Sequence, residues 1–310
     1  MKRALLAALL VLAAGAGPAR AQAVETVGAR ALGMGGAFVA VADDSSATWW
    51  NPAGLAAGAL VDLSLGIARG GAGNALPARH APAWWLSLGT PPFGVSYYRL
   101  RITDIEAIGA TGAGAADRED GGIAVPIGSL TTSQVGATLV QTLVDGIHAG
   151  TTLKYVRSGA DGGPADGTFD LDVGVMATFD HVAAGAVVRN VRQPTLGAVR
   201  LDRQVRLGIA LREVDAGAAL LTMAVDADVR RYGTVLGDRR VVAVGGEGWV
   251  LDRRIGIRAG ARFNTVGAEE RAWTAGGSLA VRSGVYVDGH VVHGGARAEQ
   301  GWGIAARVSF

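Results

Sequence analysis

From residue 59 to its end, the sequence is a long series of segments in which apolar and polar residues alternate, with turn residues between the segments. In 168–178 (TFDLDVGVMAT), apolar side chains occupy one set of alternate positions, and Asp170 and Asp172 lie between them. Segments 205–212 and 254–262 repeat the pattern with arginines at the polar positions. Period-two alternation places the two sets on opposite faces of a sheet. Many such segments, each long enough to cross a bilayer when tilted, predict an all-β fold, a transmembrane antiparallel β-barrel.

The composition agrees with a barrel better than with a helical membrane protein. No segment after the N-terminus has eighteen consecutive apolar residues, yet 49% of the chain is hydrophobic and the mean hydropathy is +0.28. A barrel explains both facts, because only one face of each strand has to be apolar. The chain has no Cys, which excludes disulfides, zinc thiolates and a cysteine nucleophile. Many of its 48 glycines fall in the expected strands, where they allow close approach inside a lumen.

Residues 1–23 have the features of a secretory signal peptide. Lys2 and Arg3 precede the apolar run 4–14, and small residues around Ala21 and Ala23 offer cleavage sites. The run is too short for a spanning helix, although an uncleaved N-terminal anchor is the alternative. Cleavage would change the formal charge from +2 to −1, because 1–23 contains three cations and no acid. We therefore expect export to the outer membrane and contact with its lipid.

The alternation predicts fourteen strands. They are 59–69, 81–90, 92–104, 131–143, 147–158, 168–178, 182–190, 202–212, 217–230, 239–250, 254–263, 271–281, 285–293 and 300–310. Short and long connections alternate, as they do in barrels with short periplasmic turns and longer external loops. If both termini are periplasmic, the strand number must be even, and the count of fourteen meets this condition. The strand assignment leaves two interpretations within 105–130: 121–127 is either another strand piece or a folded external loop.

Aromatic residues fall near the ends of the expected strands or within them. The set comprises Trp84, Trp85, Tyr97, Tyr98, Trp273 and Trp302. Such residues favour the membrane–water interface, although ordinary packing inside the barrel is the alternative for some of them.

Residues 24–58 do not alternate. Three glycines of this segment, Gly33, Gly35 and Gly36, favour tight packing or unusual backbone angles. Pro52 disfavours helix at Asn51, and Gly54 permits a sharp exit. We expect a compact element in the barrel lumen, so the chain divides into a signal peptide (1–23), an N-terminal hatch (24–58) and a barrel (59–310).

The pattern GARALGMGGAFVAVADD…NPAGLA in 28–56 resembles the FadL-type outer-membrane transport superfamily, and most closely its PorV/PorQ-like proteins. The resemblance implies a fourteen-stranded barrel with an N-terminal hatch, to which Asn51, Pro52 and Ala53 would belong. FadL-type members carry long-chain fatty acids or other hydrophobic compounds, and PorV-like members are accessories of a protein secretion system. The full set of hatch residues singled out is Gly33, Gly35, Gly36, Asp43, Asp44, Asn51, Pro52, Ala53 and Gly54.

Charged residues at polar positions of the strands should face the lumen or lie near a membrane–water interface, because an arginine facing lipid at the midplane costs roughly 2–4 kcal/mol. They are Asp170, Asp172, Arg206, Arg212, Asp226, Asp228, Arg230, Arg254, Arg258, Arg262 and Arg307. Two interpretations remain open: a charged channel lining or docking surface for the hatch, and internal ion pairs that fill a narrow lumen.

Other kinds of site have little support. His290 and His293 would lie on opposite faces of a strand, and Asp43 with Asp44 suits a cap or turn better than a cation site. No catalytic motif is present; Asp288 and His290 share a face, with Ser278 or Ser283 nearby, as the nearest candidates for a barrel enzyme. The arginines are spread over many strands, which disfavours nucleic-acid binding. We expect no cofactor, no metal and no enzyme activity.

The resemblance implies passage of hydrophobic molecules of the long-chain fatty acid type across a Gram-negative outer membrane. The mechanism would be binding at the barrel, movement of a hatch formed by 28–55, and release into the periplasm or laterally into the bilayer. The alternatives are a PorV/PorQ-like accessory that holds proteins of a secretion system, and a structural barrel closed by ion pairs.

Overall fold

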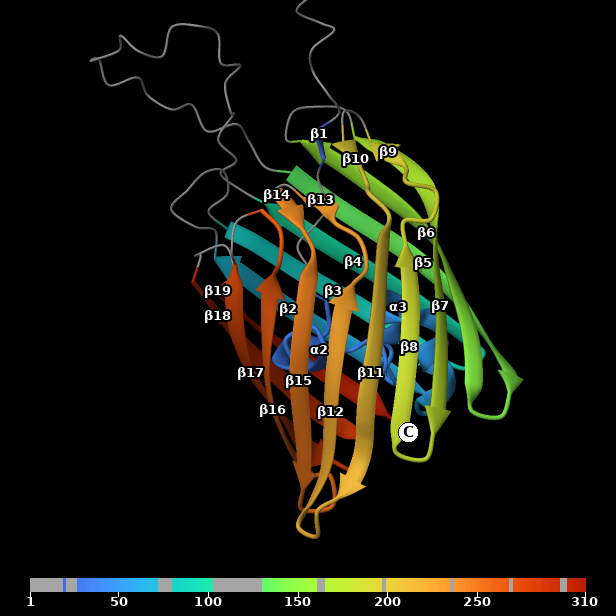
Figure 1. Ribbon diagram of the computed structural model, residues 1–310, viewed down its shortest axis with the longest axis vertical. Helices are drawn as coiled ribbons and strands as arrows, with labels where there is room; N and C mark the ends of the chain where they lie inside the picture. Colours follow the sequence, from blue (N-terminus) through green and yellow to red (C-terminus); the bar gives the residue numbers. More distant parts are fainter. Residues whose placement is uncertain are drawn as a thin grey trace, which may run out of the picture.

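The computed structural model describes residues 19–20, 27–71, 80–102, 130–160, 165–196, 199–234, 237–267, 270–295 and 300–310. Fourteen strands in these ranges form one closed antiparallel barrel (Figure 1). They are β2 (Asp62–Gly71), β3 (His80–Thr90), β4 (Phe93–Ile102), β5 (Leu130–Val144), β6 (Ile147–Ala160), β7 (Asp166–Phe179), β8 (Val182–Arg189), β11 (Gln204–Asp215), β12 (Ala219–Asp228), β15 (Val241–Val250), β16 (Ile255–Asn264), β17 (Arg271–Arg282), β18 (Val285–Gly294) and β19 (Gln300–Ser309).

Each barrel strand pairs with its neighbours in the chain, and the ring closes where β19 pairs with β2. The prediction of a fourteen-stranded antiparallel barrel is confirmed, and each predicted strand boundary lies within three residues of the observed one. The short connections, such as Asp145–Gly146 and Asp180–His181, all lie at the end of the barrel that holds the C-terminus. We call this the turn end and the opposite one the loop end. The segment 121–127 lies outside the described residues.

Two small sheets flank the loop end of the barrel. β9 (Thr195–Leu196) and β10 (Val199–Arg200) form a hairpin, and β1 (Ala19–Arg20) pairs with β10 in parallel. β13 (Tyr232–Thr234) and β14 (Gly237–Arg239) form a second hairpin. Apart from β1, the expected signal peptide lies outside the described residues.

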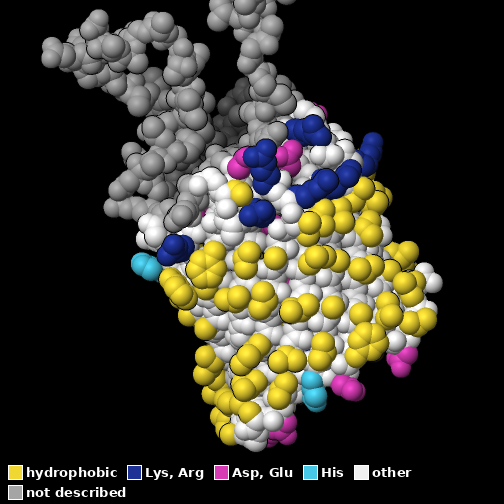
Figure 2. Space-filling view, in the orientation of Figure 1, with side chains coloured by type: hydrophobic (Ala, Val, Ile, Leu, Met, Phe, Trp, Pro, Cys, Tyr) yellow, Lys and Arg dark blue, Asp and Glu magenta, His cyan; other side chains and the backbone are white. Residues whose placement is uncertain are grey.

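The two faces of the strands differ as the alternation predicted. On β11, the Ile209 side chain is 64% exposed whereas Arg206 is 3% exposed. Figure 2 shows the hydrophobic side chains as a band across the barrel, with Lys and Arg gathered above it. Because apolar side chains facing outward have no protein partner, this band fits the hydrocarbon core of a bilayer. Among the described residues, no helix is both long and apolar enough to span a membrane.

Exposed aromatic residues lie near both ends of the band. Near the loop end these are Trp84, Phe169, Trp273 and Trp302, and near the turn end Phe93, Phe179 and Phe310. Two members of the predicted aromatic set point inward instead: Trp85 is fully buried and Tyr98 is 4% exposed. Both pack in a cluster inside the barrel, because their position on the inward face outweighs the preference for an interface.

The N-terminal segment, residues 27–58, lies inside the barrel (Figure 1). It contains α2 (Ala29–Gly33), α3 (Ala47–Trp50) and the 3₁₀ helix η1 (Pro52–Ala57). α2 contacts β16 to β19, α3 contacts β4 and β5, and η1 contacts β5 to β7. Ala31, Phe38 and Trp50 are fully buried and belong to the largest apolar cluster of the described residues. The apolar core of this barrel is therefore built by the N-terminal segment within it.

Candidate functional site

The N-terminal segment packs directly on glycines of the barrel wall. A Cβ atom on Gly245 would lie 2.2 Å from the Met34 carbonyl oxygen, and one on Gly150 would lie 2.4 Å from the Ala53 nitrogen. A Cβ atom on Gly174 would lie 2.0 Å from Asn51 Oδ1. These distances are far below a van der Waals contact, so only glycine at these positions lets the segment reach the wall.

Glycines within the N-terminal segment also allow close packing. Gly35 has φ +71° and a Cβ there would lie 2.8 Å from the Ala261 nitrogen, so both the backbone angle and the space require glycine. Gly36 also has a positive φ, 84°. Gly33 lies against Gly276, and its carbonyl oxygen accepts a hydrogen bond from Thr274 Oγ1 at 2.9 Å. Gly54 lies against Ala42, with room for no side chain.

Asn51 joins three parts of the molecule. Its Nδ2 donates to the Val39 carbonyl oxygen at 2.8 Å and to the Val175 carbonyl oxygen of β7 at 3.1 Å. Its Oδ1 accepts from the Ala53 nitrogen at 3.2 Å, which caps η1. α3 ends at Trp50 because Pro52 follows an extended Asn51, and Pro52 then begins η1. Ala53 is fully buried between these contacts.

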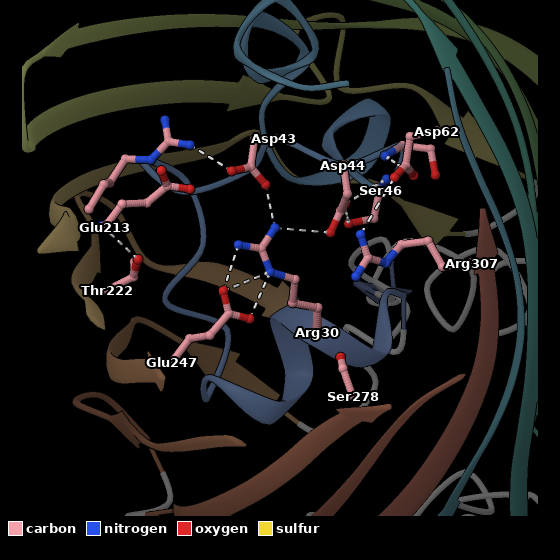
Figure 3. A network of polar contacts seen from close by, with 12 residues as sticks. Arg30, Asp43, Asp44, Ser46, Asp62, Glu213, Thr222, Glu247, Ser278 and Arg307 are labelled. Atoms are coloured by element: carbon pink, nitrogen blue, oxygen red, sulfur yellow. Dashed lines mark hydrogen bonds and ion pairs between the residues drawn. The ribbon is translucent and has the colours of Figure 1, made fainter. Parts of the chain in front are cut away.

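Arg30 is the centre of a charged network between the segment and the wall (Figure 3). Its guanidinium pairs with Asp43, lies 3.5 Å from Asp44 Oδ2, and donates to Glu247 Oε1 on β15 at 2.8 Å. Asp43 also accepts from Arg212 Nη2 of β11 at 2.6 Å. Two arginines from different elements therefore hold one acid of the segment.

The network shifts the ionisation of the segment's acids. Burial by itself would raise the pKa of Asp43, but the Arg30 and Arg212 guanidiniums hold that pKa below its usual value. The pKa of Asp44 is raised, because burial and the neighbouring Asp62 carboxylate outweigh the attraction of Arg30. Burial would lower the pKa of Arg30, yet Asp43 and Glu247 raise it well above its ordinary value. Arg30 and Asp43 are therefore both charged at neutral pH.

A second series of charged and polar contacts runs along the wall beside the network around Arg30. Arg258 donates to Glu247 Oε2 at 2.5 Å and to Ser278 Oγ at 2.5 Å. Ser278 in turn contacts Asp288, which accepts from Arg307 Nε at 3.0 Å. Through Glu247, the charges of β15 to β19 are connected to Arg30 of the segment.

Four more of the predicted lumen charges, Arg206, Asp226, Asp228 and Arg262, lie in buried positions. Asp226 accepts from the backbone nitrogens of Phe38 and Val39 at 2.7 and 2.8 Å, so it holds the segment directly. Arg206 donates to Asp228 Oδ1 at 2.7 Å. Arg262 is 8% exposed.

Asp170 and Asp172 of β7 face the lumen beside Lys154, which we did not single out. Lys154 Nζ lies 3.7 Å from Asp170 Oδ2 and donates to Asp172 Oδ1 at 2.6 Å. The Asp172 carboxylate also accepts from the Asn190 nitrogen at 2.8 Å.

Two arginines differ from the expectation. Arg254 is exposed in the turn before β16, because that strand begins one residue later, at Ile255. Arg230 is exposed beyond the end of β12. The alternation was extended past the strand ends in both cases, so the prediction that these side chains line the lumen was wrong.

Sequence reasoning missed two members of the network. Glu247 occupies an inward position of β15, so the alternation that identified the arginines would also have identified this acid. Arg30 lies in a segment without alternation, and no local pattern indicates that it points to the wall. Its role depends on how the segment is placed in the barrel.

Among the residues considered for catalysis or metal binding, Asp288 is held in ion pairs and the two histidines lie on opposite faces of β18. Asp288 belongs to the ion pairs with Arg307 and Arg258, and His290 is 6% exposed on the same face of β18. His293 lies on the opposite, exposed face. No cluster of three acidic or histidine side chains suited to a metal occurs in the part of the chain that the structure describes.

The segment lines a cavity on each of its sides. Towards the loop end is an aromatic cavity of about 60 Å³, whose walls include Trp49, Trp85, Tyr98, Gln134, Lys154 and Arg189. Towards the turn end is a polar cavity of about 510 Å³, whose walls include Arg30, Asp43, Asp180, Arg212, Arg253 and Arg307. The wide cavity is thus charged and the narrow one is mostly aromatic.

Solved structures share this fold. The Ralstonia pickettii toluene transporter TbuX is 14% identical, with a TM-score of 0.61, and the match covers 92% of this chain and 99% of that one. For the CymD monoaromatic hydrocarbon channel the identity is 11%, the TM-score 0.59 and the coverage 92% and 97%. A Pseudomonas aeruginosa FadL homologue is 13% identical, with a TM-score of 0.57, and the match covers 93% of this chain and 99% of that one. No protein-family model and no curated protein matches the sequence.

Proposed function

We propose that this protein is an outer-membrane barrel for the passage of hydrophobic molecules, with residues 28–55 as its hatch. The observation that carries the proposal is the N-terminal segment inside the barrel, with one cavity towards each end of the lumen. The shared fold supports it, because the solved structures named above are described as a toluene transporter and a hydrocarbon channel. The apolar band supports an outer-membrane location.

In this mechanism a substrate enters from the loop end, the hatch moves, and the substrate leaves towards the periplasm or the bilayer. The contacts that hold the segment are ion pairs, hydrogen bonds and close packing, which break and re-form without covalent change. We further propose cleavage of the signal peptide 1–23, a hatch of 24–58 and a barrel of 59–310. Passage by this route requires no catalytic step, so we propose no enzyme activity.

The experiment is a reversible tether between the hatch and the wall. Ser45 Oγ of the segment accepts a hydrogen bond from Ser87 Oγ of β3 at 3.0 Å, and the chain has no cysteine of its own. The double variant Ser45→Cys with Ser87→Cys therefore places two thiols at bonding reach. We expect proteoliposomes with the oxidised variant to lose uptake of a hydrophobic probe such as toluene, and reduction to restore it.

The matched control is a tether within the wall. Thr142 Oγ1 of β5 lies 3.0 Å from His148 Nδ1 of β6, and neither residue belongs to the segment or lines either cavity. Thr142→Cys with His148→Cys should leave uptake unchanged in both redox states. Uptake that persists with the oxidised hatch tether would refute the gating step, and absence of uptake by the unmodified protein would refute passage altogether.

A second candidate is a PorV/PorQ-like accessory of a protein secretion system, proposed from the motif in 28–56. The observation that favours it is the small volume of the aromatic cavity, about 60 Å³, since a protein that acts through its outer surface needs no large lumen site. Co-purification of secretion-system subunits from the native membrane, together with no uptake of hydrophobic probes, would support this candidate over the first.

A further inference from the structure

The aromatic cavity contains hydrogen-bond donors that have no acceptor. Gln134 is 7% exposed, and its Nε2 meets no hydrogen-bond partner among the described residues. The buried Trp49 Nε1 likewise meets none there. Both side chains line the same small cavity. A buried donor without a partner costs about 1–3 kcal/mol, so two of them in one cavity mark a place for an acceptor atom.

Two of the three charged residues that line this cavity, Lys154 and Arg189, already have partners, and the third, Arg99, is exposed. Lys154 Nζ donates to Asp172 Oδ1 at 2.6 Å and to Asn190 Oδ1 at 2.7 Å. The Arg189 guanidinium lies over the Trp49 ring, 5.1 Å from its centroid, and donates to Gln204 Oε1 at 3.4 Å. A carboxylate in this cavity would have to compete with these partners and lose its hydration. The cavity is therefore better matched to an uncharged oxygen.

The remaining walls are apolar and aromatic. They include Val27, Ala83, Trp85, Tyr98, Leu100 and Val156. Such walls select an apolar body, and the cavity volume of about 60 Å³ is well below the roughly 150 Å³ of a cavity that holds benzene. A ring can enter only if a wall moves, and Trp49 is the wall that belongs to α3 of the N-terminal segment.

We propose that this cavity binds a neutral carbonyl compound with a compact apolar body, whose oxygen accepts hydrogen bonds from Gln134 Nε2 and Trp49 Nε1. This inference rests on the proposed function and names the substrate class at its loop-end site. The oxygen satisfies the two donors. The Trp49 ring shifts to admit the apolar body while its Nε1 stays directed at the oxygen, and the body lies against Trp85 and Tyr98. An ordered water is the competing occupant, and a ligand oxygen replaces it.

The test compares two probes of the same shape. Acetophenone carries a carbonyl oxygen where α-methylstyrene carries a methylene group, and benzoate supplies the charged alternative. Dissociation constants are measured by calorimetry on the full chain in detergent, for the unmodified protein and for Gln134→Met and Trp49→Phe. The matched controls are Gln141→Met, an exposed glutamine on β5, and Trp302→Phe, a tryptophan on the outer face that is 48% exposed.

We expect Gln134→Met and Trp49→Phe each to weaken acetophenone binding about tenfold and to leave α-methylstyrene binding unchanged within about twofold. The two controls should change neither constant, and benzoate should bind more weakly than acetophenone. Equal weakening of both probes would mean that Gln134 only packs, and no change for either probe would mean that the cavity holds water alone. Tighter binding of benzoate would also overturn the proposal.

Uptake separates this inference from the proposed function. If proteoliposomes take up both probes and Gln134→Met changes the uptake of both to the same extent, the neutral carbonyl site is refuted and passage stands. If neither probe is taken up, passage is refuted, while the dissociation constants still decide whether the cavity recognises the oxygen.

Discussion

Neighbouring glycines on β15 face opposite environments. Gly245 faces the N-terminal segment, where a Cβ would lie 2.2 Å from the Met34 carbonyl oxygen. Gly246 faces outward, and the nearest atom to its Cβ would be the Thr222 carbonyl oxygen at 3.5 Å. The same substitution at these two positions therefore tests whether the segment packs on the wall.

We predict that Gly245→Ala lowers the free energy of unfolding by about 1–3 kcal/mol, because two backbones must separate. Gly246→Ala should leave it unchanged or raise it by up to about 1 kcal/mol, since glycine is unfavourable within a strand. Urea unfolding of the protein in lipid vesicles measures both values. Equal effects of the two substitutions would contradict the packing of the segment on the inner face.

Glu247 is the single acid between Arg30 and Arg258, and its side chain is 1% exposed. We predict that Glu247→Gln destabilises the protein by about 3–5 kcal/mol, because it leaves buried cations without their shared partner. Arg253→Gln, which breaks an ion pair with Glu213 that is about half exposed, should cost at most about 1 kcal/mol. The same unfolding measurement compares them, and a small effect at Glu247 would rule out its bridging role.

Acid should release the segment only at low pH. Because the folded pKa of Asp43 lies below its usual value, its stabilising effect is complete above the unfolded value of about 3.9 and is lost as the pH falls through the folded pKa. Asp44 has the opposite effect on stability. Because its folded pKa is raised, its ionised form destabilises the fold at pH values above that pKa. We predict that protease protection of 28–55 falls as the pH drops below about 4.

The control for this pH dependence is Asp43→Asn. The amide cannot ionise, so the acid-dependent loss of protection should become smaller in this variant. A loss of protection centred between pH 5 and 8 would contradict the assignment to Asp43.

In each barrel strand, apolar side chains face outward, and polar or small side chains face inward. Ile209 lies midway along β11 on the outer face, and Leu251 lies exposed in the turn after β15. We predict that Ile209→Arg destabilises the protein in vesicles by about 2–4 kcal/mol, whereas Leu251→Arg costs about 0–1 kcal/mol because it lies near the interface. Similar costs at both positions would exclude a membrane-embedded band at the height of Ile209.

The strands were predictable because period two is a local property of the chain. The bounds of β6 and β18, for example, differ from the predicted ones by at most two residues. The short strands β9, β10, β13 and β14 were not predicted, because two or three residues carry no period and such strands form only where loops meet. Arg254 was assigned wrongly for a related reason: alternation does not indicate where a strand ends.

The largest apolar cluster inside the barrel is formed by the N-terminal segment together with small and aliphatic residues of the wall. Several inward positions of the barrel are glycine, and Phe38, Trp50 and Met34 of the N-terminal segment fill the space that remains. The charged residues on the inner wall then serve as anchors: Asp226 for the backbone of 38–39, and Glu247 for Arg30. The two interpretations of the lumen charges, ion pairs that fill the lumen and a docking surface for the segment, are therefore compatible. Ion pairs that fill the lumen also bind the segment to the wall.

The sequence alone determined the fold class, the strand number and the two faces of each strand, because these follow from the alternation of neighbouring residues. It also marked the N-terminal segment as different, through its glycines and its Asn51–Pro52 pair. Only the tertiary structure decided which wall residues meet that segment and which donors in the aromatic cavity have no acceptor. Such contacts join residues up to about two hundred positions apart, as Arg30 and Glu247 are, and no local pattern encodes a distance of that kind.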